Sequence, residues 1–181
     1  RMAAQPSLPA SDPATPVERT IAGVAIEDEK VNLLSSGKDW YGQSIGPGGS
    51  FTYVNQLYGL IPNDVIRYRY NLIAHSDLTP FFRISQSGVS IGQHFLGTSY
   101  EYLYATAGTF EASSSSSLPA AGSSQLLFQF TSSSVAASGW IDWIEILYPR
   151  MLWAQNNWLE FHGPDTTGVI EYRLSMFERS G

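Results

Sequence analysis

The chain has 181 residues, a formal net charge of −6, 43% hydrophobic and 13% aromatic residues, and no cysteine. A chain of this length and apolar content can bury a sizeable core within one domain. The acidic balance argues against a nucleic-acid partner, because phosphate binding needs a basic patch. The lack of cysteine excludes disulfides and a cysteine nucleophile within this chain. We expect no membrane span, because no run of about 18 apolar residues is present.

Residues 1–16 repeat Pro, Ala and Ser without apolar periodicity, which predicts a disordered linker or lead-in. The remainder, residues 17–181, is predicted to form a single β-sandwich domain. The chain begins Arg-Met-Ala-Ala-Gln-Pro and ends Ser-Gly, as expected of a segment excised from a longer protein.

Strand patterns follow one another from residue 17 onward, separated by turns rich in Gly, Ser and Pro. The clearest alternation is at residues 65–74, where Tyr68 and Tyr70 face one way and Arg67 and Arg69 the other. The serine-rich stretch 110–125 is predicted to be a flexible loop. Further strands are expected at residues 17–34 (one or two short ones), 51–60, 81–85, 89–92, 100–104, 126–130, 140–148, 158–162 and 169–177.

No segment shows sustained helical periodicity with capping residues. Many short strands joined by tight turns predict an all-β fold, an antiparallel β-sandwich or jelly roll of the galactose-binding-like type. Residues 140–148 form the densest apolar and aromatic run, and we expect them to be a central strand. Strict alternation would put Asp142 and Tyr148 on one face of this strand and Glu145 on the other.

A buried carboxylate is costly unless it is paired or well hydrogen-bonded. We therefore interpret Asp142, Glu145, Tyr148 and Arg150 as structural residues. Asp142 would accept hydrogen bonds from Arg150, Arg67 or backbone donors and fix the strand register. A calcium ligand, a ligand contact and an exposed residue are the alternatives for Asp142. Because Asp142 and Glu145 point to opposite faces, they cannot form a glycosidase acid–base pair with each other.

The histidines do not show the spacing of a zinc site, since His75, His94 and His162 stand far apart in the sequence. We therefore predict no metal site and no cofactor. Calcium is an alternative, because it is bound by several oxygen ligands that converge from loops. The loop-borne candidates for such a site are Asp64, Asp77 and Asp165.

Aromatic residues near loops are the candidates for ligand binding, and they are Trp40, Tyr41, Trp153 and Trp158. Exposed indole and phenol rings can stack on sugar rings or on peptide side chains. The alternative is that each ring covers an end of the sandwich core or packs against a neighbouring domain.

Two segments together resemble a known family. The first is Leu34-Ser-Ser-Gly-Lys-Asp-Trp-Tyr-Gly42, followed by Phe51-Thr-Tyr53. The second is Trp140-Ile-Asp-Trp-Ile-Glu-Ile-Leu-Tyr-Pro-Arg150, followed by Leu159-Glu-Phe161. They resemble the non-catalytic β-sandwich region of gingipain-type cysteine peptidases, most of all the PorU-like signal peptidases of type IX secretion. The resemblance covers roughly residues 30–177.

The resemblance implies a non-catalytic accessory domain of an exported cysteine peptidase, located in the periplasm or at the cell surface. The catalytic Cys and His of the family are not carried over, so this chain is not expected to be an enzyme by itself. Its expected partners are neighbouring domains of the same polypeptide, a protein substrate or a glycan. The alternative from a different class is a carbohydrate-binding jelly-roll module.

Overall fold

The computed structural model describes residues 16–33, 35, 37–100, 103–115, 122–165 and 169–178. Apart from Pro16, the expected lead-in lies outside the described residues. In the described part the regular structure is entirely β, and it has no helix long and apolar enough to cross a membrane. The strands are β1 (Pro16–Val17), β2 (Arg19–Glu27), β3 (Val31–Asn32), β4 (Trp40–Tyr41), β5 (Ser50–Gln56), β6 (Val65–His75), β7 (Phe81–Gln86), β8 (Val89–Phe95), β9 (Thr106–Ser115), β10 (Ser123–Thr131), β11 (Ser138–Met151) and β12 (Glu171–Tyr172).

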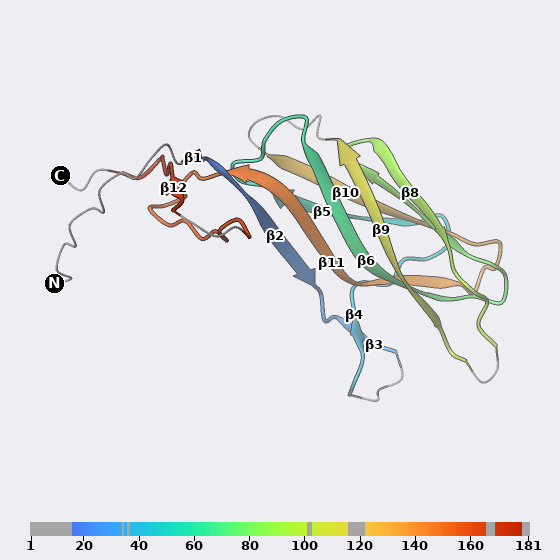
Figure 1. The fold of residues 1–181 in the computed structure, drawn as a ribbon. Coiled ribbons are helices and arrows are strands. Elements are labelled where there is room, and N and C mark those ends of the chain that lie inside the picture. Colours follow the sequence, from blue (N-terminus) through green and yellow to red (C-terminus); the bar gives the residue numbers. More distant parts are fainter. Residues whose placement is uncertain are drawn as a thin grey trace.

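Two four-stranded antiparallel sheets pack face to face (Figure 1). One sheet has the strand order β2-β11-β6-β9, and the other has the order β5-β10-β7-β8. Two two-stranded pairs, β3-β4 and β1-β12, lie outside these sheets. The prediction of an all-β antiparallel sandwich is therefore confirmed.

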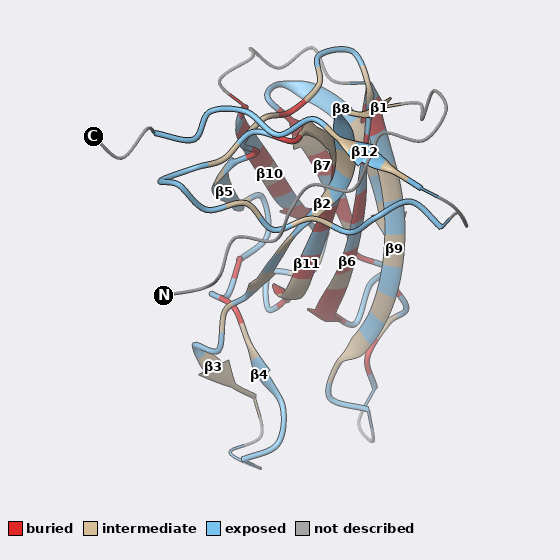
Figure 2. Cartoon of the chain, turned by 60° about the vertical axis from the view of Figure 1, so that its left-hand side comes forward, coloured by how far each residue is buried: buried red, intermediate tan, exposed pale blue. Residues whose placement is uncertain are grey.

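Alternating residues of both sheets meet in one core, and Figure 2 shows the buried positions between the sheets. On β6 the alternation read from the sequence holds, since Tyr68 and Tyr70 are buried while Arg67 and Arg69 are exposed. Burial of such large side chains is the main source of stability in a sandwich of this kind.

Aromatic contacts across the two sheets lock the centre of the core. The ring of Tyr70 meets the ring of Phe128 edge-on, with centroids 5.5 Å apart. The Tyr70 hydroxyl lies 2.7 Å from Nε2 of His94, and the His94 ring stacks on Phe110 at 4.3 Å. Burial lowers the pKa of His94, so the folded chain favours the neutral imidazole. His94 is therefore a partly buried residue that is hydrogen-bonded to the core.

The central strand β11 pairs with β2 on one side and β6 on the other, but its alternation is interrupted. Ile141 pairs with Leu72 and Ile144 with Tyr70, so three residues of β11 span two of β6. This is a β-bulge, which inserts one residue and lets the side chains on either side of it face the core. Ile141 joins Ile144 inside, whereas strict alternation had assigned them to opposite faces.

Several expected elements are wrong. Within the loop expected at 110–125, residues 110–115 belong to β9, whose backbone pairs along β6, and residues 123–125 belong to β10, which pairs with β5. Residues 100–104 and 158–162 form no strand in their described parts, since only single bridges join them to other residues. The strand expected at 169–177 is reduced to β12, because the chain there finds no sheet edge beyond β1.

Replacement of Ile144 by alanine should destabilise the chain by about 2–5 kcal/mol, the range for large core truncations. Ile144 is 1% exposed at the centre of β11. Trp143→Ala is the matched control on the same strand, because this ring is partly exposed and faces outward beneath Arg69. Urea unfolding measures both changes. A loss for Ile144→Ala well under 1 kcal/mol would show that β11 is not the central strand.

Candidate functional site

The four aromatic candidates fall into two separate pairs. Trp40 and Tyr41 form β4, which contacts β11 near its beginning, and the indole of Trp40 is 43% exposed. Trp153 and Trp158 follow the end of β11, at the opposite end of the sandwich (Figure 1). The structure therefore divides the four rings between the two ends of the sandwich and does not bring them into one site.

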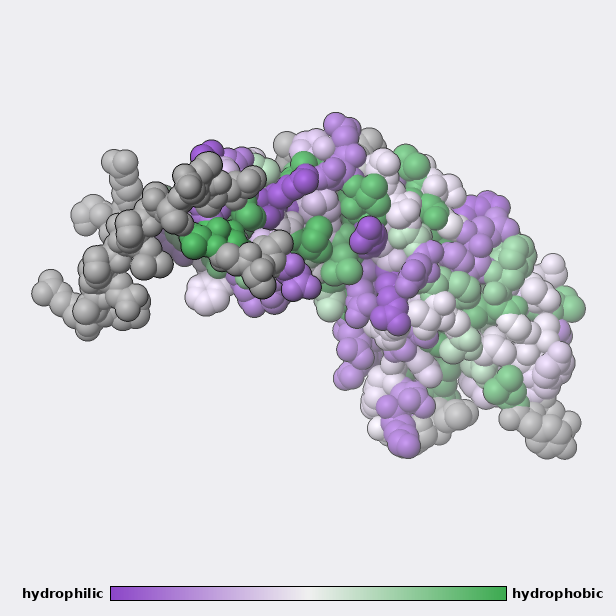
Figure 3. All heavy atoms as spheres, in the orientation of Figure 1, coloured by the Kyte–Doolittle hydropathy of each residue, from purple (hydrophilic) through white to green (hydrophobic). Residues whose placement is uncertain are grey.

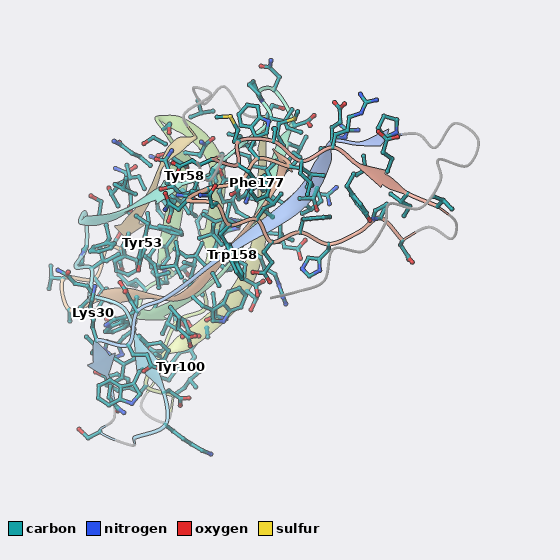
Figure 4. All side chains as sticks on the ribbon, turned by 90° about the vertical axis from the view of Figure 1, so that its left-hand side faces the viewer. Lys30, Tyr53, Tyr58, Tyr100, Trp158 and Phe177 are labelled. Carbon is teal, nitrogen blue, oxygen red and sulfur yellow. The ribbon has the colours of Figure 1, made fainter. Side chains whose placement is uncertain are left out.

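Residues 152–165 and 169–178, which follow β11 and which we call the C-terminal segment, expose an unusual amount of apolar surface. Its residues 152–158 run beside residues 173–178, joined by the bond from Ala154 N–H to the Ser175 carbonyl at 2.9 Å and by the Trp153–Ser175 bridge. Figure 4 shows Trp158 and Phe177 on this side of the molecule, and Tyr100 well away from them. The large apolar side chains of this segment, 39–73% exposed, are Trp153, Trp158, Val169, Leu174, Met176 and Phe177.

The four residues interpreted as structural have different surroundings. The Glu145 carboxylate lies 3.5 Å from Nη1 of Arg69. The buried Tyr148 donates its hydroxyl proton to the Tyr58 carbonyl at 3.4 Å. Nη2 of Arg150 donates to the Trp153 carbonyl at 2.6 Å, which anchors the start of the C-terminal segment to the end of β11.

Asp142 lies in the β11 bulge and has no hydrogen-bond or ion-pair partner among the described residues. Burial raises the pKa of its carboxyl, and the nearby charges of Glu27 and Asp39 raise it further. Burial raises the pKa of the Tyr41 hydroxyl, and the negative charges of Asp39 and Asp142 raise it further. The bulge thus places Asp142 in an acidic corner.

The calcium candidates Asp64 and Asp77 line different cavities. Asp64 lies 3.7 Å from the Arg19 guanidinium, and Asp165 is exposed. In the part of the chain that the structure describes, no group of three or more His, Asp or Glu side chains could hold a metal ion.

The cavity that Asp77 lines, of about 800 Å³, is a candidate site that the sequence analysis did not predict. The His75 ring stacks on Tyr104 at 4.8 Å, and its Nδ1 lies 3.2 Å from the Ser99 hydroxyl. The Tyr100 ring beside them is 71% exposed. The sequence pattern at 100–104 predicts a strand, so it gives no sign that Tyr100 and Tyr104 lie in a loop beside a cavity.

A second hollow lies on the outer face of the sheet β2-β11-β6-β9. Two adjacent cavities, of about 450 and 830 Å³, are both lined by Arg67 and Leu147, and we call them together the sheet groove. It is bordered at one end by Glu111 of β9 and at the other by His162 and Gly163 of the C-terminal segment. Its residues come from strands far apart in the sequence, so no local motif could have signalled it.

The geometry defines a β-sandwich module with a surface groove. No protein-family model and no curated protein sequence matches the chain. Among solved structures it is similar to dimeric latent PorU from Porphyromonas gingivalis, with a TM-score of 0.67 and 17% identity over 81% of this chain and 14% of that chain. It is less similar to the CBM36-1 domain of a multidomain xylanase from the hindgut metagenome of Trinervitermes trinervoides (TM-score 0.45, 11% identity, 69% and 96% covered) and to carbohydrate-binding module CBM36 in complex with calcium and xylotriose (0.42, 15%, 69% and 98%).

At 17% identity the likeness to PorU shows the fold, and it spans only 14% of the PorU chain. The β-sandwich that the family resemblance implied is therefore confirmed. The two carbohydrate-binding modules match at TM-scores too low to add to that conclusion.

Replacement of Asp142 by asparagine should stabilise the chain at pH 7. Because the folded pKa of Asp142 is raised above its ordinary value of 3.8, the folded chain binds this proton more tightly than the unfolded chain does. Its contribution to stability is therefore present below that value and lost as pH rises through the folded pKa. The gain of Asp142→Asn in urea unfolding should vanish near pH 3.

The matched control is Asp165→Asn, which changes an exposed carboxylate in a loop. If Asp142→Asn instead lowers stability at pH 7, the ionised Asp142 accepts stabilising hydrogen bonds, as the sequence had suggested.

Proposed function

We propose that this chain is a non-catalytic accessory β-sandwich domain of an exported, gingipain-like cysteine peptidase similar to the type IX secretion signal peptidases. The observation that carries the proposal is the match of 81% of the chain to a small part, 14%, of the PorU chain. The two sequence segments that resemble this family include β4, the start of β5 and most of β11. The chain would act in the periplasm or at the cell surface.

The C-terminal segment supports the accessory role. Six large apolar side chains of this segment are exposed, whereas the surface of a free-standing domain rarely gathers such side chains. A neighbouring domain of the same polypeptide is the occupant that the proposal assigns to them. The segment is tied to the sandwich by the Arg150–Trp153 bond and by the ion pair between Arg173 and Glu18 at 3.0 Å.

The gene that encodes this chain should also encode a Cys/His peptidase domain. Sequencing of the flanking DNA tests this directly, because the chain itself contains no cysteine. A gene without any such domain contradicts the proposal.

Replacing both Trp158 and Phe177 by serine should weaken docking of the neighbouring domain but leave the fold of the chain intact. Because both side chains are exposed, the unfolding free energy of the chain alone should change by only about 0.5 kcal/mol. In the longer polypeptide the same pair should increase limited proteolysis between this module and its neighbour. Tyr100→Ser is the matched control, since this exposed ring lies away from the C-terminal segment. Unchanged proteolysis in the double variant would rule out docking through this surface.

A carbohydrate-binding module is the second candidate, and the cavity around Tyr100 favours it. Exposed tyrosine rings can stack on sugar faces, while His75 and Asp77 provide polar groups beside them. Titration calorimetry against the glycans retained by an array, with and without calcium, tests this candidate. Binding that is lost in Tyr100→Ala would support it, and the absence of any retained glycan would contradict it.

A further inference from the structure

Gly23 of β2 leaves the wall of the sheet groove low on that side. Gly23 of β2 pairs with Leu147 of β11, and Ala25 pairs with Glu145, so the β2 side of the face is low. A Cβ atom built on Gly23 would lie 3.4 Å from Cδ2 of Leu147. A larger side chain at position 23 would therefore extend into the hollow without displacing the strand. Figure 3 views this face, where hydrophobic residues border hydrophilic ones.

Three arginines line the groove, and two of them, Arg19 and Arg69, form ion pairs with carboxylates. Arg19 lies 3.7 Å from Asp64. Arg69 lies 3.5 Å from Glu145, and its cross-strand neighbours, Glu145 on β11 and Glu111 on β9, are both acidic. Two of the arginines that line the groove thus have carboxylate neighbours.

Arg67 is different, because its cross-strand neighbours are Leu147 on β11 and Ser113 on β9. It makes no ion pair with any carboxylate in the described ranges of the chain. Its guanidinium therefore presents unused donors at the point where the two cavities meet. Such a group fits a carboxylate through two parallel hydrogen bonds.

The surface on one side of Arg67, in the larger cavity, is aliphatic. Leu147 is 48% exposed, Val65 49% and Ile21 57%, and all three line the larger cavity. Tyr68 also lines the groove, but its side chain is buried in the core. Sugar rings are bound mainly by aromatic faces, whereas aliphatic walls suit aliphatic side chains. The lining therefore favours a peptide over a glycan.

We propose that the sheet groove binds an extended peptide whose carboxylate pairs with Arg67 and whose neighbouring aliphatic side chains lie on Leu147, Val65 and Ile21. The groove crosses four strands, a width of roughly 15 Å, which an extended peptide spans with about five residues. The carboxylate is supplied either by an acidic side chain or by the carboxyl terminus of the peptide. This inference is independent of the C-terminal docking surface and of the parent protein.

The test is a titration of the whole chain with acetyl-Ser-Val-Leu-Asp-Leu-Val-Ser-amide, followed by backbone amide NMR shifts. Saturable shifts should appear in β2, β6 and β11. The same peptide with Asn in place of Asp should bind about 10- to 100-fold more weakly, because a charge-assisted pair is lost. A third peptide, acetyl-Ser-Val-Leu-Val with a free carboxyl terminus, distinguishes the two sources of the carboxylate.

Two variants locate the binding. Arg67→Gln should reduce affinity for the Asp peptide by the same factor, while Arg83→Gln on the outer face of the other sheet should leave it unchanged. Gly23→Val, which keeps every charge, should block the groove and also weaken binding. Thermal unfolding shows that each variant is folded.

Three results would overturn the proposal. They are no saturable binding to the unmodified chain by either carboxylate peptide, equal affinity for the Asp and Asn peptides, or unchanged affinity in Arg67→Gln. Binding of acidic oligosaccharides in the groove, with none of the peptides bound, would overturn the choice of a peptide as well.

Discussion

The double pairing of β11 is the constraint on which the rest of the structure depends. This 14-residue strand forms ladders with both β2 and β6, so its register decides which side chains of three strands face the core. The bulge at Asp142 and Trp143 lets Ile141 and Ile144 both enter the core. One inserted residue thus reconciles two apolar runs that strict alternation would have set on opposite faces.

The same register of β11 also positions the sheet groove and the start of the C-terminal segment. On the outer face it aligns Leu147 with Arg67 and Glu145 with Arg69, which makes the centre of the sheet groove cationic and leaves its edge neutralised. At the end of β11, Arg150 holds the first turn of the C-terminal segment. The sheet groove and the exposed apolar C-terminal segment are therefore both positioned by one strand.

Much of the fold could be predicted from local pattern. The alternation around Tyr68 identified β6, and Ser87-Gly88, both at positive φ, form the two-residue turn expected between β7 and β8. The bulge could not be predicted, because an inserted residue leaves the composition of a strand unchanged. The site was harder still: Arg67, Leu147 and Ile21 meet only through long-range strand pairing. Such pairing is invisible to a pattern read along the chain.

Hydrogen–deuterium exchange on the chain alone and within its longer polypeptide tests most directly that this is a docked accessory module. Residues 152–158 and 169–178 carry exposed apolar side chains and lie outside the two four-stranded sheets, so in the isolated chain their amides should exchange faster than those of β6 and β11. In the longer polypeptide these two stretches should become protected, while β6 and β11 stay as they were. Equal exchange in both contexts would contradict the account, because the C-terminal segment would then face solvent in the parent protein too.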